Sequence, residues 1–125
     1  MALSRDRSQR KVSGGRYKKV GKKLKQLLGL PALTKVVENT IKPKTTHGGG
    51  EKLTLLSTNI INVLDTKTKK FQKTEISTVL ENPANRNYVR RNIITKGTIV
   101  ETKLGKVKVT SRPGQEGTMN GILLK

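Results

Sequence analysis

The sequence lacks cysteine and tryptophan altogether, and it contains a single histidine, His47. Without cysteine there can be no disulfide, thiolate metal site or cysteine nucleophile, and one histidine cannot form the usual multi-histidine metal cluster. The acidic residues after the N-terminal region are isolated from one another in the sequence, so no pair of carboxylates is placed for acid–base catalysis. We therefore predict that the chain is not an enzyme and holds no metal or cofactor.

Aromatic residues are almost as scarce, since Tyr17, Phe71 and Tyr88 are the only ones. Proteins that read single-stranded nucleic acid stack bases on two or three rings of one sheet. The sequence offers no such set of rings. Contacts to the backbone and the folded shape of a nucleic acid are therefore favoured over base stacking.

The sequence also lacks a long apolar run. None approaches the ~18 residues of a membrane span, and the basic N-terminus has no apolar core of the kind found in secretory signals. An Arg-rich, acid-poor N-terminus also resembles an organellar transit peptide, but Lys residues and a Gly-Gly pair continue straight into the rest of the chain. A permanent arm, in a cytoplasmic protein without a membrane partner, is the favoured interpretation.

Positive charge is present in excess, because 27 Lys and Arg oppose 8 Asp and Glu and give a net charge of +19. Ten of the basic residues lie within the first 25 positions, where Asp6 is the only acid. Such a chain repels itself unless a polyanion neutralises it, and a basic arm on a domain is typical of nucleic-acid binding. The predicted contacts in this arm are Arg5, Arg7, Arg10, Lys11, Arg16, Lys18, Lys19, Lys22, Lys23 and Lys25.

One segment of the arm has helical periodicity. Its apolar positions are Tyr17, Val20, Leu24, Leu27 and Leu28. Their spacing predicts a short amphipathic helix over residues 17–28 that the turn signals Gly29 and Pro31 end. A helix lying on a membrane surface is the alternative, but the segment has neither Trp nor Phe to anchor it.

The remainder of the chain is rich in Thr, Val and Ile, which suit half-buried strands. Strand-like runs lie at residues 34–37, 53–64, 74–80, 93–102, 106–110 and 119–124. About six short antiparallel strands favour a small barrel or sandwich. The predicted fold is mostly β: a basic extended arm over residues 1–30, one short helix, and a small antiparallel β-barrel or sandwich over residues 31–125.

Local signals refine this fold. The pair Leu104-Gly105 predicts a tight hairpin, and the doubled apolar pairs at residues 55–56 and 60–61 predict bulges or strand bends that curl a sheet into a barrel. Residues 42–50, rich in Pro, Gly and Thr, are predicted to form a loop. Its glycines resemble a phosphate-binding loop, but the Lys-Ser/Thr ending and the strand–loop–helix setting are missing, so we predict no nucleotide site there.

Two turns that carry arginine complete the set of candidate contacts. Residues 82–92 combine one Pro with four Asn and three Arg, which predicts a loop holding one helical turn over residues 87–91. Residues 110–115 predict a tight turn. An Arg side chain can donate two hydrogen bonds to a phosphate or to a guanine edge, although solvated charges on a structural turn are the alternative. The predicted contacts in these turns are Arg86, Arg90, Arg91 and Arg112.

Several segments carry a resemblance to a known family. The long ones are NPAN at residues 82–85, NYVRRNIITKG at 87–97 and VTSRPGQ at 109–115. The short ones are GGR at 14–16, KK at 22–23, LG at 28–29, Pro31 and TKV at 34–36. Together they span nearly the whole chain, which resembles the archaeal and eukaryotic small-subunit ribosomal protein family S8e. The short length is similar to that of archaeal members.

The resemblance implies a β-barrel-like domain on rRNA in the small subunit, a basic N-terminus threading into the rRNA, and neighbouring ribosomal proteins as further partners. No small-molecule substrate is implied. By matching position, the implied rRNA contacts are Arg16, Lys22, Lys23, Lys35, Arg90, Arg91 and Arg112. The chain departs from the family pattern at Leu30 and at residues 47–50, so no RNA contact is carried over to those places.

These observations predict a non-catalytic structural constituent of the small ribosomal subunit, which supports translation and binds rRNA through its phosphate backbone. A small basic DNA-binding protein of chromatin is the alternative. Such proteins usually insert apolar wedges into the minor groove, and no aromatic wedge is evident in the sequence. A third possibility, an enzyme that modifies or cleaves RNA, would have to depend on His47 or Tyr88.

Overall fold

The N-terminal part of the chain forms a unit of its own. The computed structural model describes residues 3–4, 8, 10–18, 27–46 and 48–124, and the chain divides into two units, Met1–Pro31 and Ala32–Lys125. In the first unit, strand β1 (Leu3–Ser4) pairs antiparallel with β2 (Leu27–Leu28). The backbone N–H of Lys11 donates to the Gly15 carbonyl at 2.7 Å and closes a tight turn.

The prediction of a helix over residues 17–28 is wrong at both ends. Tyr17 and Lys18 are not helical, and the two leucines at its far end form β2. The centre of the segment, residues 19–26, lies outside the described residues. The apolar spacing misled because Leu27 and Leu28 pair with β1 rather than cover a helix face.

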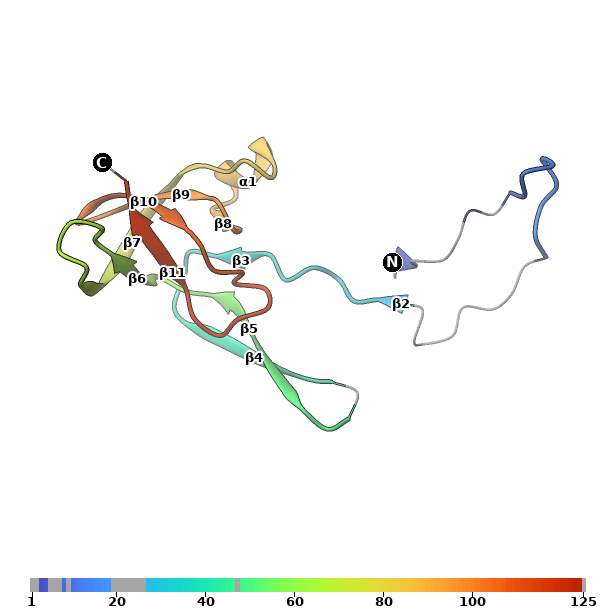
Figure 1. The fold of residues 1–125 in the computed structure, drawn as a ribbon, viewed down its shortest axis with the longest axis horizontal. Helices are drawn as coiled ribbons and strands as arrows, with labels where there is room; N and C mark the ends of the chain where they lie inside the picture. Colours follow the sequence, from blue (N-terminus) through green and yellow to red (C-terminus); the bar gives the residue numbers. More distant parts are fainter. Residues whose placement is uncertain (1–2, 5–7, 9, 19–26, 47, 125) are drawn as a thin grey trace. The chain divides into compact units, whose positions relative to one another are not determined.

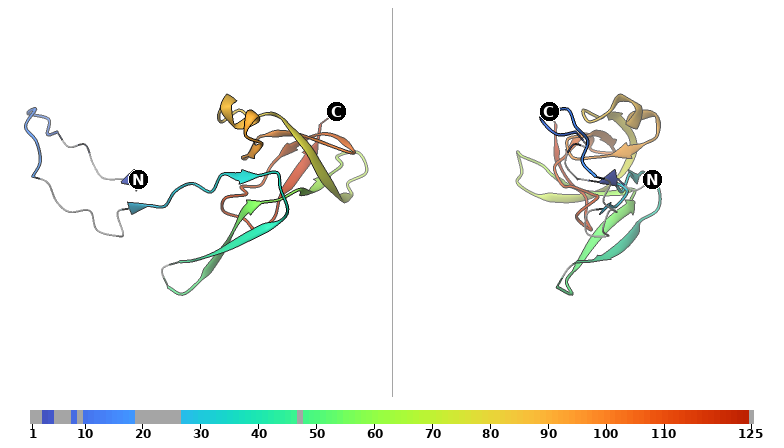
Figure 2. Two further views of the ribbon diagram at one scale, coloured as in Figure 1. Left: turned by 180° about the vertical axis from the view of Figure 1, so that it is seen from behind. Right: turned by 90° about the vertical axis from the view of Figure 1, so that its right-hand side faces the viewer.

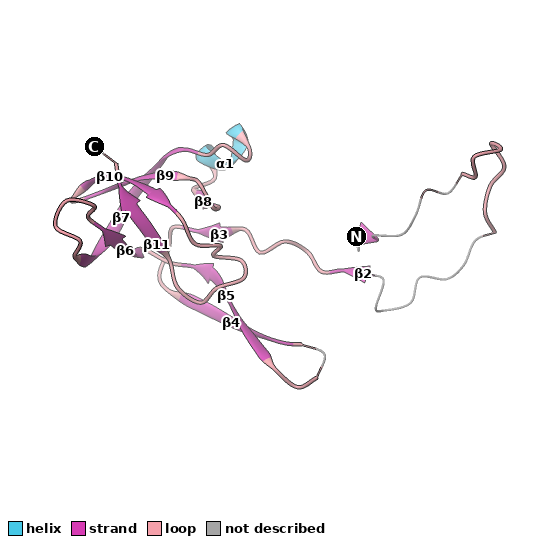
Figure 3. Ribbon diagram, in the orientation of Figure 1, coloured by secondary structure: helices cyan, strands magenta, loops and turns pink. Residues whose placement is uncertain are grey.

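The second unit contains most of the secondary structure (Figure 1). Its strands are β3 (Thr34–Lys35), β4 (Thr40–Thr45), β5 (Glu51–Ser57), β6 (Ile60–Leu64), β7 (Phe71–Glu81), β8 (Ile93–Ile94), β9 (Ile99–Thr102), β10 (Gly105–Val109) and β11 (Asn120–Leu123). Helix α1 (Arg86–Arg90) is the one helix in the described part of the chain (Figure 3). No helix there is long and apolar enough to cross a membrane.

Five of these strands close into a barrel in the order β10-β11-β6-β7-β9, which confirms the prediction of a small barrel. Four pairings are antiparallel, whereas β11 runs parallel to β6. A closed ring with an odd number of strands cannot alternate direction throughout, so one pairing must be parallel. The predicted antiparallel barrel is therefore correct except at this one junction.

The remaining strands form a four-stranded sheet in the order β4-β5-β3-β8. Its β4–β5 hairpin extends away from the barrel (Figures 1 and 2). The loop predicted over residues 42–50 is too long, because Lys42, Pro43 and Lys44 belong to β4. Proline is tolerated there since β4 is an edge strand, and the missing N–H costs no bond inside the sheet. The second part of the predicted loop is a turn, closed by the hydrogen bond from the Thr46 N–H to the Gly50 carbonyl.

The core lies inside the barrel and beneath the second sheet. Along β6, Ile61 and Val63 point inward and are almost fully buried, and Val107 and Val109 do the same along β10. Leu55 of β5 joins the same cluster, so the hairpin is anchored to the barrel core at its base. The clean alternation of residues 106–109 therefore confirms one buried and one exposed face.

Bulges occur at one of the two predicted places. The register of β4 against β5 shifts so that Leu56 has no partner, which confirms the bulge at residues 55–56. Residues 60–61 pair regularly with β7, and the barrel's bulges lie instead in β7, where the register skips Ser77 and Leu80. The long β7 can therefore bend along the barrel wall.

Two predicted strands are each divided in the structure. The run at residues 53–64 breaks at Thr58 and Asn59 between β5 and β6, and the run at residues 93–102 breaks between β8 and β9. The predicted tight hairpin is confirmed, with Lys103 and Leu104 in the turn and Gly105, the first residue of β10, paired with Thr102 of β9. The helical turn predicted over residues 87–91 is also confirmed, displaced by one residue.

Candidate nucleic-acid interface

The loop between β7 and β8 is held in place by Asn82. Its side-chain Nδ2 donates to the Ile93 carbonyl at 3.0 Å, while its Oδ1 accepts from the Ala84 N–H and from Thr95 Oγ1, each at 3.0 Å. Both ends of the loop are thereby tied to one largely buried side chain. Asn82 is therefore a structural residue that fixes where the arginines of this loop lie.

Helix α1 begins at a second asparagine of the same loop. Asn85 is its N-cap, and its Oδ1 accepts the Asn87 N–H at 2.9 Å. Asn92 follows the helix with a positive φ of 49°, a left-handed conformation that asparagine tolerates better than most residues. The local asparagines thus serve as caps and turn formers, which accounts for their number in this segment.

The arginines of α1 are exposed and uncompensated. Arg86 and Arg90 lie one helical turn apart, where side chains face one another. The first turn has no acidic residue, although the N-terminus of a helix favours negative charge. Arg91 is the C-cap. Helix electrostatics therefore disfavour Arg86 at the N-terminus, whereas Arg90 in the last turn and Arg91 at the C-cap lie where positive charge is favourable.

The other predicted contacts of the second unit, Lys35 and Arg112, lie on or near strand β3. Lys35 is exposed and pairs with Ile93 of β8, two residues after Arg91. On the other side of β3, Gly114 of the Arg112 turn lies against Ala32. That turn is confirmed by hydrogen bonds to the Arg112 carbonyl from the N–H groups of Gln115 and Glu116, at 2.8 and 2.9 Å.

In the first unit, three of the predicted RNA contacts that the structure describes lie at the turn around Gly14. Arg10 and Arg16 face each other across it, Arg10 Nη1 donates to the Gly14 carbonyl at 3.1 Å, and Lys11 Nζ lies 5.5 Å from the centroid of the Tyr17 ring. Gly14 supplies the positive φ of 81° that the turn needs. Lys18 is exposed. The predicted contacts outside the described residues are Arg5, Arg7, Lys19, Lys22, Lys23 and Lys25.

The structure adds a basic surface that sequence reasoning missed. On the β4–β5 hairpin, Lys44 lies directly opposite Lys52, and Lys42 occupies the next position on the same face. Like charges directly opposite are unfavourable in a free sheet. The period-two spacing of Lys42 and Lys44 on either side of Pro43 was the signal that could have revealed this strand.

The glycine run of this hairpin has a structural role. The N–H of Thr46 donates to the Gly50 carbonyl at 2.7 Å, and Gly48 and Gly49 have positive φ values of 94° and 82°. Strand, turn and strand follow one another here, so the setting of a nucleotide-binding glycine loop is absent from this described segment. His47 itself lies outside the described residues.

Few of the positive charges are neutralised within the described residues. The one ion pair among them joins Lys103 Nζ to Glu75 at 2.8 Å. This hydrogen bond and the opposite charge lower the pKa of Glu75 and raise the pKa of Lys103. Hydrogen bonds from the Lys67 N–H and the Thr68 hydroxyl likewise lower the pKa of Asp65. The arginine turns and the hairpin lysines therefore form no ion pair within the described part of the chain.

Comparison with known proteins finds one family over nearly the whole chain. A family model described as ribosomal protein S8e matches residues 4–124. The chain is 50% identical over 126 residues to the small ribosomal subunit protein eS8 of Methanococcus aeolicus, an alignment that covers 99% of this chain and 98% of that protein. It is 51% identical over 125 residues to the protein of the same name from Methanobrevibacter smithii, covering 99% of this chain and 100% of that protein.

Proposed function

Because the chain belongs to the ribosomal protein S8e family, we propose that it is a structural constituent of the small ribosomal subunit and binds rRNA through contacts to the phosphate backbone. The full-length match to a ribosomal family is the observation that carries this proposal, and it also supports the prediction that the chain is not an enzyme. The chain acts in translation, as part of ribosomes in the cytoplasm, beside neighbouring small-subunit proteins.

The exposed cations supply the affinity. Each Lys or Arg that neutralises a phosphate releases a condensed counterion, and this release drives binding without reading the base sequence. Arg86 and Arg90, one turn apart on a capped helix, can each donate two hydrogen bonds to a phosphate. Lys35, on the strand β3 that pairs with β8, and Arg112, in the turn whose Gly114 lies against Ala32, add further contacts, and Arg91 completes this group.

The two parts of the chain have different tasks in this proposal. Residues 1–30 form a basic extension that contacts rRNA along its length, and residues 31–125 form the barrel domain that presents the arginine turns. Folded RNA is recognised chiefly by its shape and by its phosphate and 2′-hydroxyl positions. A rigid barrel with positive turns at fixed places is suited to that kind of recognition.

A competition experiment tests the proposal. A labelled folded fragment of small-subunit rRNA is bound to the full chain and displaced by unlabelled rRNA fragment or by duplex DNA of equal length. We expect the rRNA fragment to compete far better. The double variant Arg90→Gln/Arg91→Gln should weaken rRNA binding more than Lys106→Gln does. Lys106 is a basic residue of β10 that lies opposite Glu101 of β9. Equal competition by DNA would favour the DNA-binding alternative.

A further inference from the structure

The outward surface of the barrel carries an aromatic ring that the core does not use. Phe71 is the only phenylalanine of the chain, yet 71% of it is exposed. It begins β7 directly opposite Leu64 of β6, and Leu64 is aligned with Ile122 of β11. Leu64 and Ile122 are half-buried. The three aligned side chains therefore form an apolar strip across neighbouring strands, and the Phe71 ring lies at one end of the strip.

A polar row lies next to this strip on the same face. Asn62 lies two residues before Leu64 on β6, and it is aligned with Asn120 of β11 and with Lys73 of β7. Asn62 Nδ2 donates to Asn120 Oδ1 at 3.1 Å, which shows that the two amides point to the same side of the sheet. Among the described residues, Asn62 Oδ1 and Asn120 Nδ2 have no hydrogen-bond partner. One acceptor and one donor are thus presented together.

Positive charge surrounds the strip. Lys108 lies opposite Ile122 at one end, and Lys73 follows Phe71 by two residues on its own strand at the other. The turn that leads into Phe71 carries Lys67, Lys69 and Lys70. The outward-facing acid next along β7, Glu75, is already paired with Lys103 at 2.8 Å. The face is therefore apolar at its centre and cationic around its edge.

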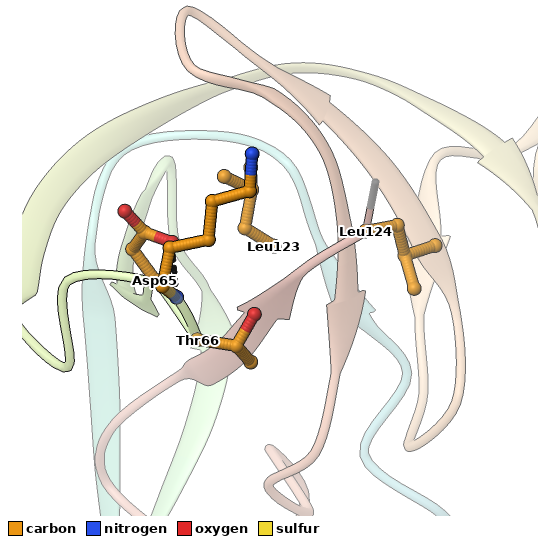
Figure 4. Close-up of a pocket in the computed structure, with 5 residues that line it drawn as sticks. Asp65, Thr66, Leu123 and Leu124 are labelled. Atoms are coloured by element: carbon orange, nitrogen blue, oxygen red, sulfur yellow. Dashed lines mark hydrogen bonds between the residues drawn. The ribbon is translucent and has the colours of Figure 1, made fainter.

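The turn before Phe71 is built to present its lysines. Asp65 accepts hydrogen bonds from the Lys67 N–H and from Thr68 Oγ1, both at 2.9 Å, so the carboxylate is engaged within the turn. Lys69 has a positive φ of 54°, a conformation that a lysine adopts only at a cost. A surface pocket of about 420 Å³ lies beside this turn, lined by Asp65, Thr66, Lys67, Leu123 and Leu124 (Figure 4).

We infer that this face binds one unpaired nucleotide of RNA, whose base stacks on Phe71. The base edge lies against the paired amides of Asn62 and Asn120, and the flanking phosphates lie against Lys73, Lys108 and the lysines of the turn. Every base has a flat face and an edge that bears hydrogen-bonding groups, so the site accepts any base. One ring cannot form a long platform, and stacking here supplements the backbone contacts.

Charge decides between a nucleotide and a protein partner. Exposed apolar patches mark interaction sites in general. A protein partner would favour a rim of mixed charge, whereas the edge of this strip offers lysines and no free carboxylate among the described residues named above. Exposed aromatic rings flanked by cations are the usual means of holding a single-stranded base.

The inference rests on the proposed RNA-binding function and is tested by a double-mutant cycle. The full chain and Phe71→Ala are titrated with a fluorescent single-stranded adenine oligoribonucleotide and with the same sugar–phosphate strand lacking its bases. We expect the wild-type chain to bind the base-bearing strand about 5- to 150-fold more tightly than the abasic strand. Phe71→Ala should lose this preference while still binding the abasic strand normally.

Controls separate stacking from other causes. Leu104→Ala removes an apolar side chain that is 44% exposed on the β9–β10 turn and should keep the preference for bases. Phe71→Trp should keep or increase it, whereas Phe71→Leu should lose it. Equal preference in the wild-type chain and in Phe71→Ala overturns the inference and favours a protein partner at this face. If the wild-type chain binds neither strand nor folded rRNA, the proposed function itself fails.

Discussion

At the scale of single residues, one glycine decides how closely the barrel can pack. Gly121 of β11 points into the core, where an added Cβ would lie 2.5 Å from Val107 Cγ1, 2.9 Å from Ile61 Cδ1 and 3.0 Å from the Lys108 carbonyl oxygen. Its φ is not in the left-handed region, so the requirement is one of space alone. The close packing of β11 in the barrel thus requires a residue without a side chain at position 121.

Gly121→Ala should therefore destabilise the domain. Overpacking of this kind costs about 1–3 kcal/mol in the free energy of unfolding, because the backbone oxygen of Lys108 cannot move without disturbing β10. Urea denaturation of both proteins measures the difference. Gly114→Ala is the matched control, since its Cβ would meet Ala32 only at ordinary distances of 3.5 Å and more. Equal stability of Gly121→Ala and the wild-type chain would contradict this account.

At the scale of elements, helix α1 combines good caps with unfavourable charge. Asn85 caps its N-terminus, but Arg86 stands in the first turn and faces Arg90 one turn later. A positive charge at a helix N-terminus and a like-charge pair each cost a few tenths of a kcal/mol. An element with only five residues has little stability to lose, so this charge pattern is better explained by binding than by folding.

Arg86→Gln should separate the two effects. We expect the thermal stability of the free protein to rise slightly or remain equal, because the repulsion of Arg86 by Arg90 and by the helix dipole is removed. The affinity for folded rRNA should fall, together with the salt dependence of binding, by about one phosphate contact. Thermal unfolding and filter binding measure the two quantities. A variant that is both less stable and unchanged in RNA affinity would assign Arg86 a purely structural role.

Sequence reasoning located most elements but not their pairing. The alternation at residues 106–109 and the turn at Leu104-Gly105 identified β9 and β10, because both signals are local. The β4–β5 hairpin escaped because Pro43 is acceptable only on an edge strand, and edge position depends on tertiary structure. The parallel β6–β11 junction likewise follows from ring closure, which no local pattern records.

Sequence reasoning also located part of the candidate nucleic-acid interface. The arginines of residues 82–92 and Arg112 were recognised as charged turns, and the structure brings the two turns to either side of β3. The face that contains Phe71, Asn62 and Asn120 escaped because these residues are far apart in sequence. They meet only through the registers of β6, β7 and β11. Long-range registers are the information that a single sequence does not display.

At the scale of the whole molecule, the net charge of +19 is the dominant quantity. Ion pairs within the chain cannot reduce this excess, because each one, such as Lys103 with Glu75, joins one positive to one negative charge. Self-repulsion of this kind opposes the compact state and favours association with a polyanion. The barrel core, built from Ile and Val on facing strands, must hold the domain together against that repulsion.

Salt should therefore control the affinity of the isolated chain for folded rRNA. Counterion release makes the logarithm of the binding constant fall linearly with the logarithm of the salt concentration, by about one unit of slope for each phosphate neutralised. Measured across a KCl series, the full chain should show a steep negative slope, and Arg90→Gln/Arg91→Gln should reduce it by about two units. Phe71→Ala should weaken binding of single-stranded RNA without altering its slope, because stacking carries no charge. A binding constant that does not change with KCl would show that phosphate contacts do not hold this protein on RNA, and both the arginine turns and the arm would then need another explanation.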